Sequence, residues 1–181
     1  MVQIAGEGRE RFGVVRAGAN AGDLAGAKAA YLVALHRGPA DAAQWSYYGS
    51  MLMNMHDDAD ARAALEKGVA IDAKNTEALN NLAWFYATSF HKKFRNPAKA
   101  LRFSLRSNDL SAWQNASYID TYAAALDLAG KHDDAAIVEQ EAVYLAPKRT
   151  DFQETLKKYE LELSQSKHSP KSAPAERNQA N

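Results

Sequence analysis

The chain has 181 residues, of which 46% are hydrophobic, and this is enough for one folded domain with a tail. Its 22 basic and 22 acidic residues balance, so the net charge argues for neither a nucleic-acid partner nor a membrane surface, and we expect neither. No apolar run approaches the roughly 18–20 residues of a membrane-spanning helix, so we expect no membrane insertion. The chain has no cysteine, which excludes a disulfide framework. We expect a cytoplasmic protein, or a periplasmic one if a leader sequence has been removed.

The first part of the chain has a weak helical pattern. Residues 1–7 carry no pattern, and we expect them to be flexible. The first unit is predicted over about residues 8–41. Its first helix, at about 9–20, is weakened by two interior glycines, whereas the segment 22–39 carries small and apolar residues at helical spacing.

The second unit, residues 42–75, shows the clearest helical hairpin. Apolar residues recur three and four apart over 42–55 and again over 58–72, which predicts two amphipathic helices. The sequence His56-Asp57-Asp58 interrupts the pattern, and we expect its aspartates to cap the second helix. Each helix also contains an interior glycine, at Gly49 and Gly68. Because such a glycine costs about 1 kcal/mol relative to alanine, these two indicate a close approach of helix backbones.

The third unit, residues 76–115, contains an insertion. Its second helix resumes late, so about five extra residues are expected in the hairpin turn, over roughly Ser89–Asn96. Asn96 and Pro97 are typical of a helix cap and a first helical turn, so they predict where the second helix begins.

The inserted turn and the helix after it are basic. The chain has no acidic residue between Ala78 and Asn108. An acidic peptide or a phosphate surface could bind there, although such a run is more often a solvated helix face and loop. The residues of this possible acidic-partner patch are Lys92, Lys93, Arg95 and Lys99.

The C-terminal part predicts one more hairpin, a single helix and a tail. The fourth unit spans residues 116–149. The segment 150–164 carries apolar residues on one side, which is typical of a helix that covers the end of a helical array. Residues 165–181 are polar and without periodicity, so we expect them to be disordered.

The hairpins repeat with a period of about 34 residues, the spacing of a helical solenoid. In the second unit the repeated places are held by Trp45, Tyr48, Gly49, Leu52, Ala61, Leu65 and Gly68. In the fourth unit they are held by Ile119, Tyr122, Ala123, Leu126, Ala135, Glu139 and Ala142, with Pro147 closing the unit. This pattern resembles the tetratricopeptide repeat, and the lengthened turn before the Asp120-Thr121 segment resembles a bacterial version of the array. The departures are Glu139, Ser104 and Ser107, which stand where apolar residues are usual.

The resemblance implies an all-α, right-handed superhelical solenoid of about four antiparallel helix pairs with a C-terminal capping helix. It also implies a concave wall, built from the first helix of each pair, that grips a peptide or a helix. Laid on this chain, the pattern places the following residues on the wall: Phe12, Arg16, Ser50, Met53, Asn54, Asn80, Trp84, Thr88, Asp120 and Asp127.

Trp84 admits two interpretations. The resemblance places it on the groove, where a tryptophan is a common interface anchor. Alternatively, it packs under the inserted turn as an additional core residue. Some relatives in the resembled family clamp a terminal carboxylate with Lys, Asn and Arg, but here only Asn81 fits such a clamp, and we do not expect one.

The sequence carries no sign of catalysis or of a bound metal. It has no G-x-S-x-G, no phosphate-binding glycine loop and no cysteine nucleophile. His56-Asp57-Asp58 and His132-Asp133-Asp134 lie in predicted turns, and adjacent residues there do not converge on one ion, so no metal and no cofactor is expected.

We therefore expect a non-enzymatic scaffold or adaptor that binds another protein in its concave groove. The alternative is a self-associating structural module, which would be a homo-oligomer, or an accessory subunit of a larger complex.

Overall fold

The computed structural model describes residues 24–36 and 40–168. Within those ranges the secondary structure is helical and no strand is present, which confirms the predicted all-α class. None of the helices in these ranges is long and apolar enough to cross a membrane. The first helix predicted at about 9–20, with Phe12 and Arg16, lies outside the described residues.

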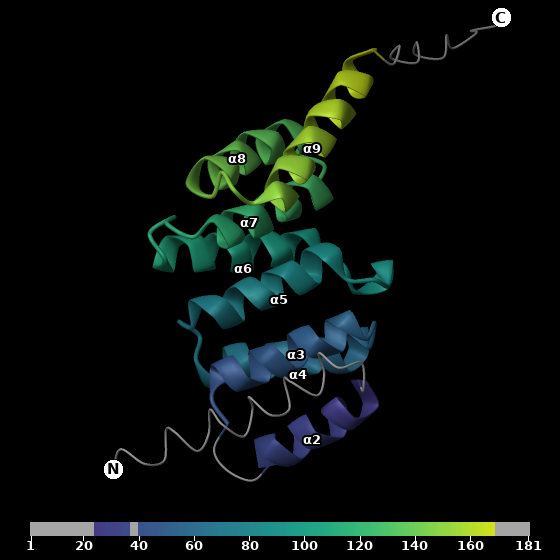
Figure 1. Ribbon diagram of the computed structural model, residues 1–181, viewed down its shortest axis with the longest axis vertical. Helices are drawn as coiled ribbons and strands as arrows, with labels where there is room; N and C mark the ends of the chain where they lie inside the picture. Colours follow the sequence, from purple (N-terminus) through teal and green to yellow (C-terminus); the bar gives the residue numbers. More distant parts are fainter. Residues whose placement is uncertain (1–23, 37–39, 169–181) are drawn as a thin grey trace, which may run out of the picture.

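The helices stack as a solenoid along the long axis of the molecule (Figure 1). Consecutive helices form antiparallel hairpins in which α3 packs on α4, α5 on α6 and α7 on α8, and α5 also contacts both α3 and α7. The elements are α2 (Leu24–His36), α3 (Ala42–Asn54), α4 (Asp58–Ile71), α5 (Thr76–Thr88), the 3₁₀ turn η1 (Lys92–Phe94), α6 (Pro97–Leu110), α7 (Ala116–Leu128), α8 (His132–Leu145) and α9 (Thr150–His168).

Side chains placed immediately before the helices determine where they begin. The Asp41 side chain accepts from the backbone N–H of Gln44, whose own side chain accepts from the Asp41 N–H, and this completes a capping box. At the starts of α5, α6 and α7 the side chains of Asn75, Asn96 and Asn115 each accept one hydrogen bond from a backbone N–H of the first turn. The Oδ1 atom of Asn96 lies 2.9 Å from the backbone nitrogen of Lys99, and Pro97 follows at the first helical position. The predicted start of α6 is confirmed.

Two glycines allow α3 and α4 to pack closely. A Cβ atom at Gly68 would lie 2.9 Å from the backbone oxygen of Ala42. A Cβ at Gly49 would overlap the side chain of Leu65, which is fully buried. The predicted close approach of the two backbones is therefore confirmed, and it explains why interior glycines are present despite their helix-weakening effect.

The inserted turn folds back onto the preceding hairpin. The Oδ2 atom of Asp58 accepts from the backbone N–H of His91 at 2.7 Å and lies 3.0 Å from its ring Nδ1. The rings of Phe90 and His56 stack with centroids 4.1 Å apart. Asp58 is almost fully buried at this contact, so the insertion is attached to the second unit as well as to its own.

The expectation that Asp57 and Asp58 cap α4 is wrong. Asp57 occupies the cap position, but its side chain makes no capping hydrogen bond and instead pairs with Lys28 of α2. The side chain of Asp58 instead accepts a hydrogen bond from the backbone N–H of His91 in the inserted turn. The two carboxylates are used to join α4 to its neighbours, because each finds a stronger or more buried partner than the first N–H groups of its own helix.

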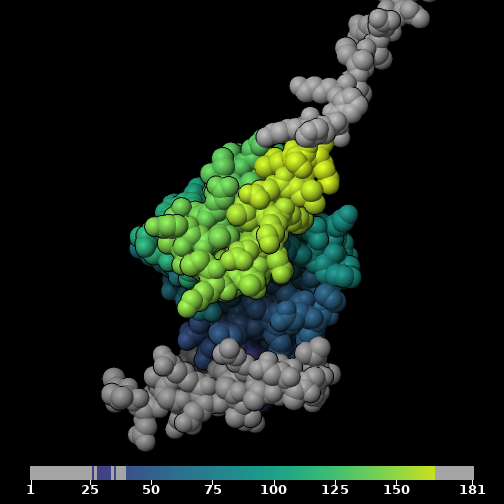
Figure 2. Space-filling model, turned by 45° about the horizontal axis from the view of Figure 1, so that its top comes forward, coloured from purple at the N-terminus to yellow at the C-terminus, as the bar shows by residue number. Residues whose placement is uncertain are grey.

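The last helix, α9, packs on α8 and closes the C-terminal end of the solenoid (Figures 1 and 2). Phe152 and Tyr159 are buried in this contact, as the apolar stripe predicted. The helix continues to His168, past the expected end at residue 164. The reason is that each residue added to an existing helix gains a backbone hydrogen bond, even where no apolar contact supports it.

Candidate functional site

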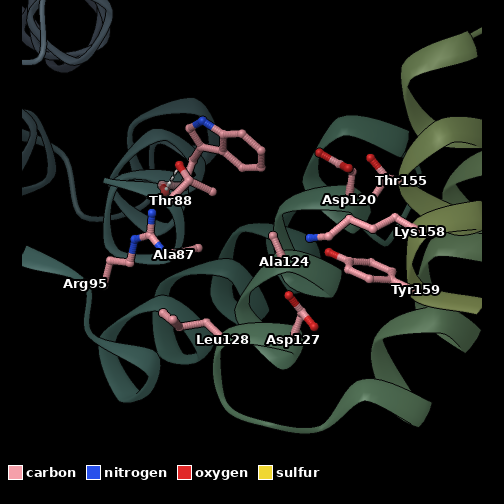
Figure 3. A pocket seen from close by; sticks show the side chains of 11 residues that line it. Ala87, Thr88, Arg95, Asp120, Ala124, Asp127, Leu128, Thr155, Lys158 and Tyr159 are labelled. Atoms are coloured by element: carbon pink, nitrogen blue, oxygen red, sulfur yellow. Dashed lines mark hydrogen bonds between the residues drawn. The ribbon is translucent and has the colours of Figure 1, made fainter. Parts of the chain in front are cut away.

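A cavity of about 320 Å³ opens where α5, α7 and α9 face one another (Figure 3). Thr88 and Arg95 lie on one side of it, and Asp120, Lys158 and Tyr159 lie on the other. Its lining comprises Trp84, Ala87, Thr88, Arg95, Asp120, Ala124, Asp127, Leu128, Thr155, Lys158 and Tyr159. The cavity thus brings together four residues that the sequence placed on the groove wall: Trp84, Thr88, Asp120 and Asp127.

The other predicted wall residues do not line this cavity. Ser50 and Met53 are partly buried, and the Ser50 hydroxyl donates to the backbone oxygen of Ser46 at 3.1 Å. Asn54 is exposed at the end of α3, and Asn80 is buried with its Oδ1 unpartnered among the described residues. Ser50, Met53 and Asn54 belong to α3, in the unit before the cavity, and Asn80 lies on α5, one turn before Trp84.

Trp84 does not pack as a buried residue beneath the inserted turn. It lines the cavity and keeps 38% of its surface exposed. The ring beneath the inserted turn belongs instead to Phe85, which is fully buried with its centroid 6.1 Å from that of Phe94. Helical geometry explains why Trp84 and Phe85 face different surroundings, because consecutive residues of a helix point in directions about 100° apart. Part of the Trp84 side chain is therefore exposed at the cavity.

The four basic residues of the predicted patch have different neighbours. Arg95 donates from Nε to the backbone oxygen of Ser89 at 2.9 Å and lines the cavity. Lys99 donates to the Tyr86 hydroxyl at 3.0 Å and lies 3.6 Å from a Glu66 carboxylate oxygen. Lys93 lies over the Phe94 ring, and Lys92 is exposed. Two of the four cations are thus engaged within the solenoid, on different parts of it.

Behind the cavity lies a buried carboxyl group. Glu139 of α8 is fully buried, and within residues 24–36 and 40–168 neither of its side-chain oxygens has a hydrogen-bond partner. Burial raises the pKa of Glu139 to about 8, and the neighbouring Asp120 contributes to the rise. Glu139 is therefore mostly protonated near neutral pH.

Asp120 connects this buried group to the cavity. The pKa of Asp120 is raised to about 6, chiefly by burial and also by the charge of Asp151, while Arg149 acts in the opposite direction. The same burial raises the pKa of Tyr159, which the nearby carboxylates also increase. The repeat pattern of the sequence identified Glu139 only as a residue that stands where an apolar one is usual. The structure shows that the departure forms a carboxyl pair with a groove residue.

A second polar cluster lies at the rim of the cavity. The Nδ1 atom of His132 lies 2.7 Å from Oδ1 of Asp127, and Glu162 of α9 brings a third ligand-type atom, all within 4.8 Å of one another. The three groups come from α7, α8 and α9, and the neighbouring turn residues Asp133 and Asp134 are not among them. The groups are largely at the surface and are accounted for by ion pairs, since Lys158 also lies 3.9 Å from Glu162.

Sequence reasoning missed the contribution of α9 to the site. Thr155, Lys158 and Tyr159 line the cavity, although the apolar stripe only predicted that this helix covers α8. The stripe includes Tyr159, which was a usable signal, because a tyrosine in such a stripe often keeps its hydroxyl at a polar boundary. The clamp candidate Asn81 is already engaged, since its side-chain amide donates to the Ser46 hydroxyl at 2.9 Å.

The described helices define a helical-repeat protein with the fold of tetratricopeptide-repeat arrays. Among solved structures, the chain is similar to TTC0263, a tetratricopeptide-repeat protein of Thermus thermophilus, with a TM-score of 0.72 and 14% identity over 86% of this chain and 82% of that chain. It is also similar to MamA, with a TM-score of 0.61 and 20% identity over 86% and 98% of the two chains. It is also similar to the first tetratricopeptide-repeat domain of human RPAP3, with a TM-score of 0.62 and 20% identity over 73% of this chain and 99% of that chain. No protein-family model and no curated protein sequence matches the chain.

Proposed function

We propose that this chain is a non-enzymatic scaffold that binds an extended peptide or a short helix of another protein in its concave groove. The observation that carries the proposal is the position of Trp84, partly exposed on a cavity between three helices. The first repeat domain of Spaghetti (RPAP3), which has this fold with a TM-score of 0.58 and 19% identity, is bound to the HSP90 peptide SRMEEVD. A domain with this fold therefore binds a peptide in that protein.

The chemistry of the cavity suits a side chain that is apolar along its length and polar at its end. Trp84, Ala87, Ala124 and Leu128 supply apolar surface, and carboxylates and cations surround it. Tryptophan anchors that become buried on binding typically contribute about 2 kcal/mol or more when truncated to alanine, which corresponds to roughly a 30-fold loss of affinity.

The proposal is tested with the variant Trp84→Ala and a matched control. Tyr144→Ala is the control, because Tyr144 is 77% exposed on α8 and does not line the cavity. A partner is first isolated from native extract with the unaltered chain and identified by mass spectrometry, and its dissociation constant is then measured with each purified variant. We expect Trp84→Ala to lose affinity about 30-fold without a change in melting temperature. Equal affinity for both variants would remove Trp84 as the anchor.

Self-association is the second candidate function, and exposed apolar residues on the C-terminal hairpin favour it. Ile137 and Tyr144 of α8 are 65% and 77% exposed, and Leu161 of α9 is 58% exposed. A second copy that covered this face would make the chain a structural module or an accessory subunit. Light scattering over a wide concentration range tests this, and a strict monomer at the highest concentration excludes it.

A further inference from the structure

The charges around the cavity are not evenly compensated. Asp127 has His132 as its partner at 2.7 Å. Among the residues that the structure describes, Asp120 forms no ion pair, although it lines the cavity and lies beside the buried Glu139. Within this part of the chain, the α7 wall therefore holds a carboxylate without a cation and, behind it, a second carboxyl group without any hydrogen-bond partner.

The two cations that line the cavity, Arg95 and Lys158, are not paired with Asp120. Arg95 is fixed by its hydrogen bond to the Ser89 carbonyl on the side of the cavity opposite Asp120. Lys158 lies on the same side as Asp120, but its ammonium group lies 3.9 Å from Glu162 and 5.5 Å from the centroid of Tyr159. Neither makes an ion pair with Asp120, so the cavity still offers a site for one positive charge.

We propose that the cavity receives the basic side chain of a lysine or arginine from the partner, with its stem against Trp84 and its charged end at Asp120, in front of the buried Glu139. This inference rests on the proposed groove function and specifies the chemistry of the partner. The stem is apolar and suits the tryptophan surface, and a cation near an indole gains further electrostatic attraction. A charge-assisted hydrogen bond to Asp120 fixes the end of the side chain.

Glu139 gives the site a property that a plain surface carboxylate lacks. A cation at Asp120 favours the ionised form of Glu139, so binding near neutral pH releases a proton from the pair. The groups that act on this pair are Arg149, just before α9, and Asp151 and Tyr159 on it, while Asp127 and Glu162 act in turn on Tyr159. The Glu139→Gln variant retains the contact between His132 and Asp127, so it changes the buried carboxyl group alone.

The first experiment is a selection from a displayed library of random peptides on the full-length chain. Clones that also bind the Trp84→Ala variant are discarded, so the retained peptides depend on the groove. We expect the retained peptides to share a lysine or arginine at one position. Replacing that residue by glutamine should lower the affinity at least tenfold, and Asp120→Asn should abolish the preference of the chain for the basic peptide.

The outcomes separate the two proposals. Groove-dependent peptides without a shared basic residue, or a preference that survives Asp120→Asn, would overturn this inference and leave the proposed function standing. A selection that yields no groove-dependent peptide would overturn both.

The second experiment measures proton release with a selected basic peptide. Titration calorimetry at pH 7 in two buffers of different ionisation enthalpy gives the number of protons released on binding. We expect up to about one proton for the unaltered chain, because a group with a pKa of about 8 is mostly protonated at pH 7. The affinity of the unaltered chain for the basic peptide should rise from pH 6 to pH 8. In Glu139→Gln both effects should shrink to the contribution of the other groups, and equal proton release in both proteins would contradict the role given to Glu139.

Discussion

The buried Glu139 predicts an unusual dependence of stability on pH. An exposed glutamate has a pKa near 4.5, whereas burial raises that of Glu139 to about 8 in the folded chain. Between these two values the folded chain keeps a proton that the unfolded chain releases, so the free energy of unfolding falls as the pH rises. For one such group the fall between pH 5 and pH 8 amounts to about 3 kcal/mol. Asp120, whose pKa is raised from 3.8 to about 6, acts in the same direction.

The substitution Glu139→Gln isolates this effect, because glutamine keeps the shape of the side chain and cannot ionise. Urea unfolding followed by circular dichroism at pH 5, 6, 7 and 8 gives the free energy of unfolding of the chain and its variant. We expect Glu139→Gln to gain stability relative to the unaltered chain as the pH rises, by about 3 kcal/mol between pH 5 and pH 8. Glu141→Gln is the matched control, since Glu141 is exposed on the same helix. A difference between Glu139→Gln and the unaltered chain that is the same at pH 5 and pH 8 would refute the reasoning.

Three further predictions concern the packing of the hairpins. Gly49→Ala places a methyl group against the buried Leu65. The resulting overpacking costs about 1–3 kcal/mol, which exceeds the ~1 kcal/mol gained in helix propensity, so the melting temperature should fall. A higher melting temperature would contradict the close approach of the two helices. Asp58→Ala removes both contacts to His91, so trypsin should cleave the inserted turn faster under native conditions, and an unchanged rate would show that the turn is held by other contacts. Asn96→Ala removes the cap of α6 and should cost about 1 kcal/mol in urea unfolding, an effect that Asn96→Asp should largely restore.

The hairpins and their ends could be predicted from the sequence because the signals are local. The apolar spacing over 42–55 and 58–72 predicts α3 and α4 to within about one residue. Asn96-Pro97 predicts the start of α6, because a cap and a first-turn proline depend only on neighbouring residues. Helical spacing also places Trp84 and Thr88 on one side of α5, where both line the cavity.

The rest of the site depends on contacts between distant residues, which spacing alone does not reveal. Asp58 looks like a cap in sequence, but its partner His91 is 33 positions away. The stripe on α9 indicates that the helix is covered on one side, yet it does not indicate that Lys158 and Tyr159 reach the cavity of α5 and α7. The burial of Glu139 beside Asp120 requires α7, α8 and α9 to be placed together.

The attachment of the inserted turn has a consequence for how the array comes apart. In a solenoid each unit is held only by its neighbours, so unfolding can begin wherever the boundary between two units is weakest. The contacts of Phe90 and His91 with the second unit, together with Arg62 lying 5.4 Å from the centroid of the Phe94 ring, strengthen the boundary between the second and third units. These two units should therefore unfold as one cooperative block, and partial opening should start from the terminal hairpins.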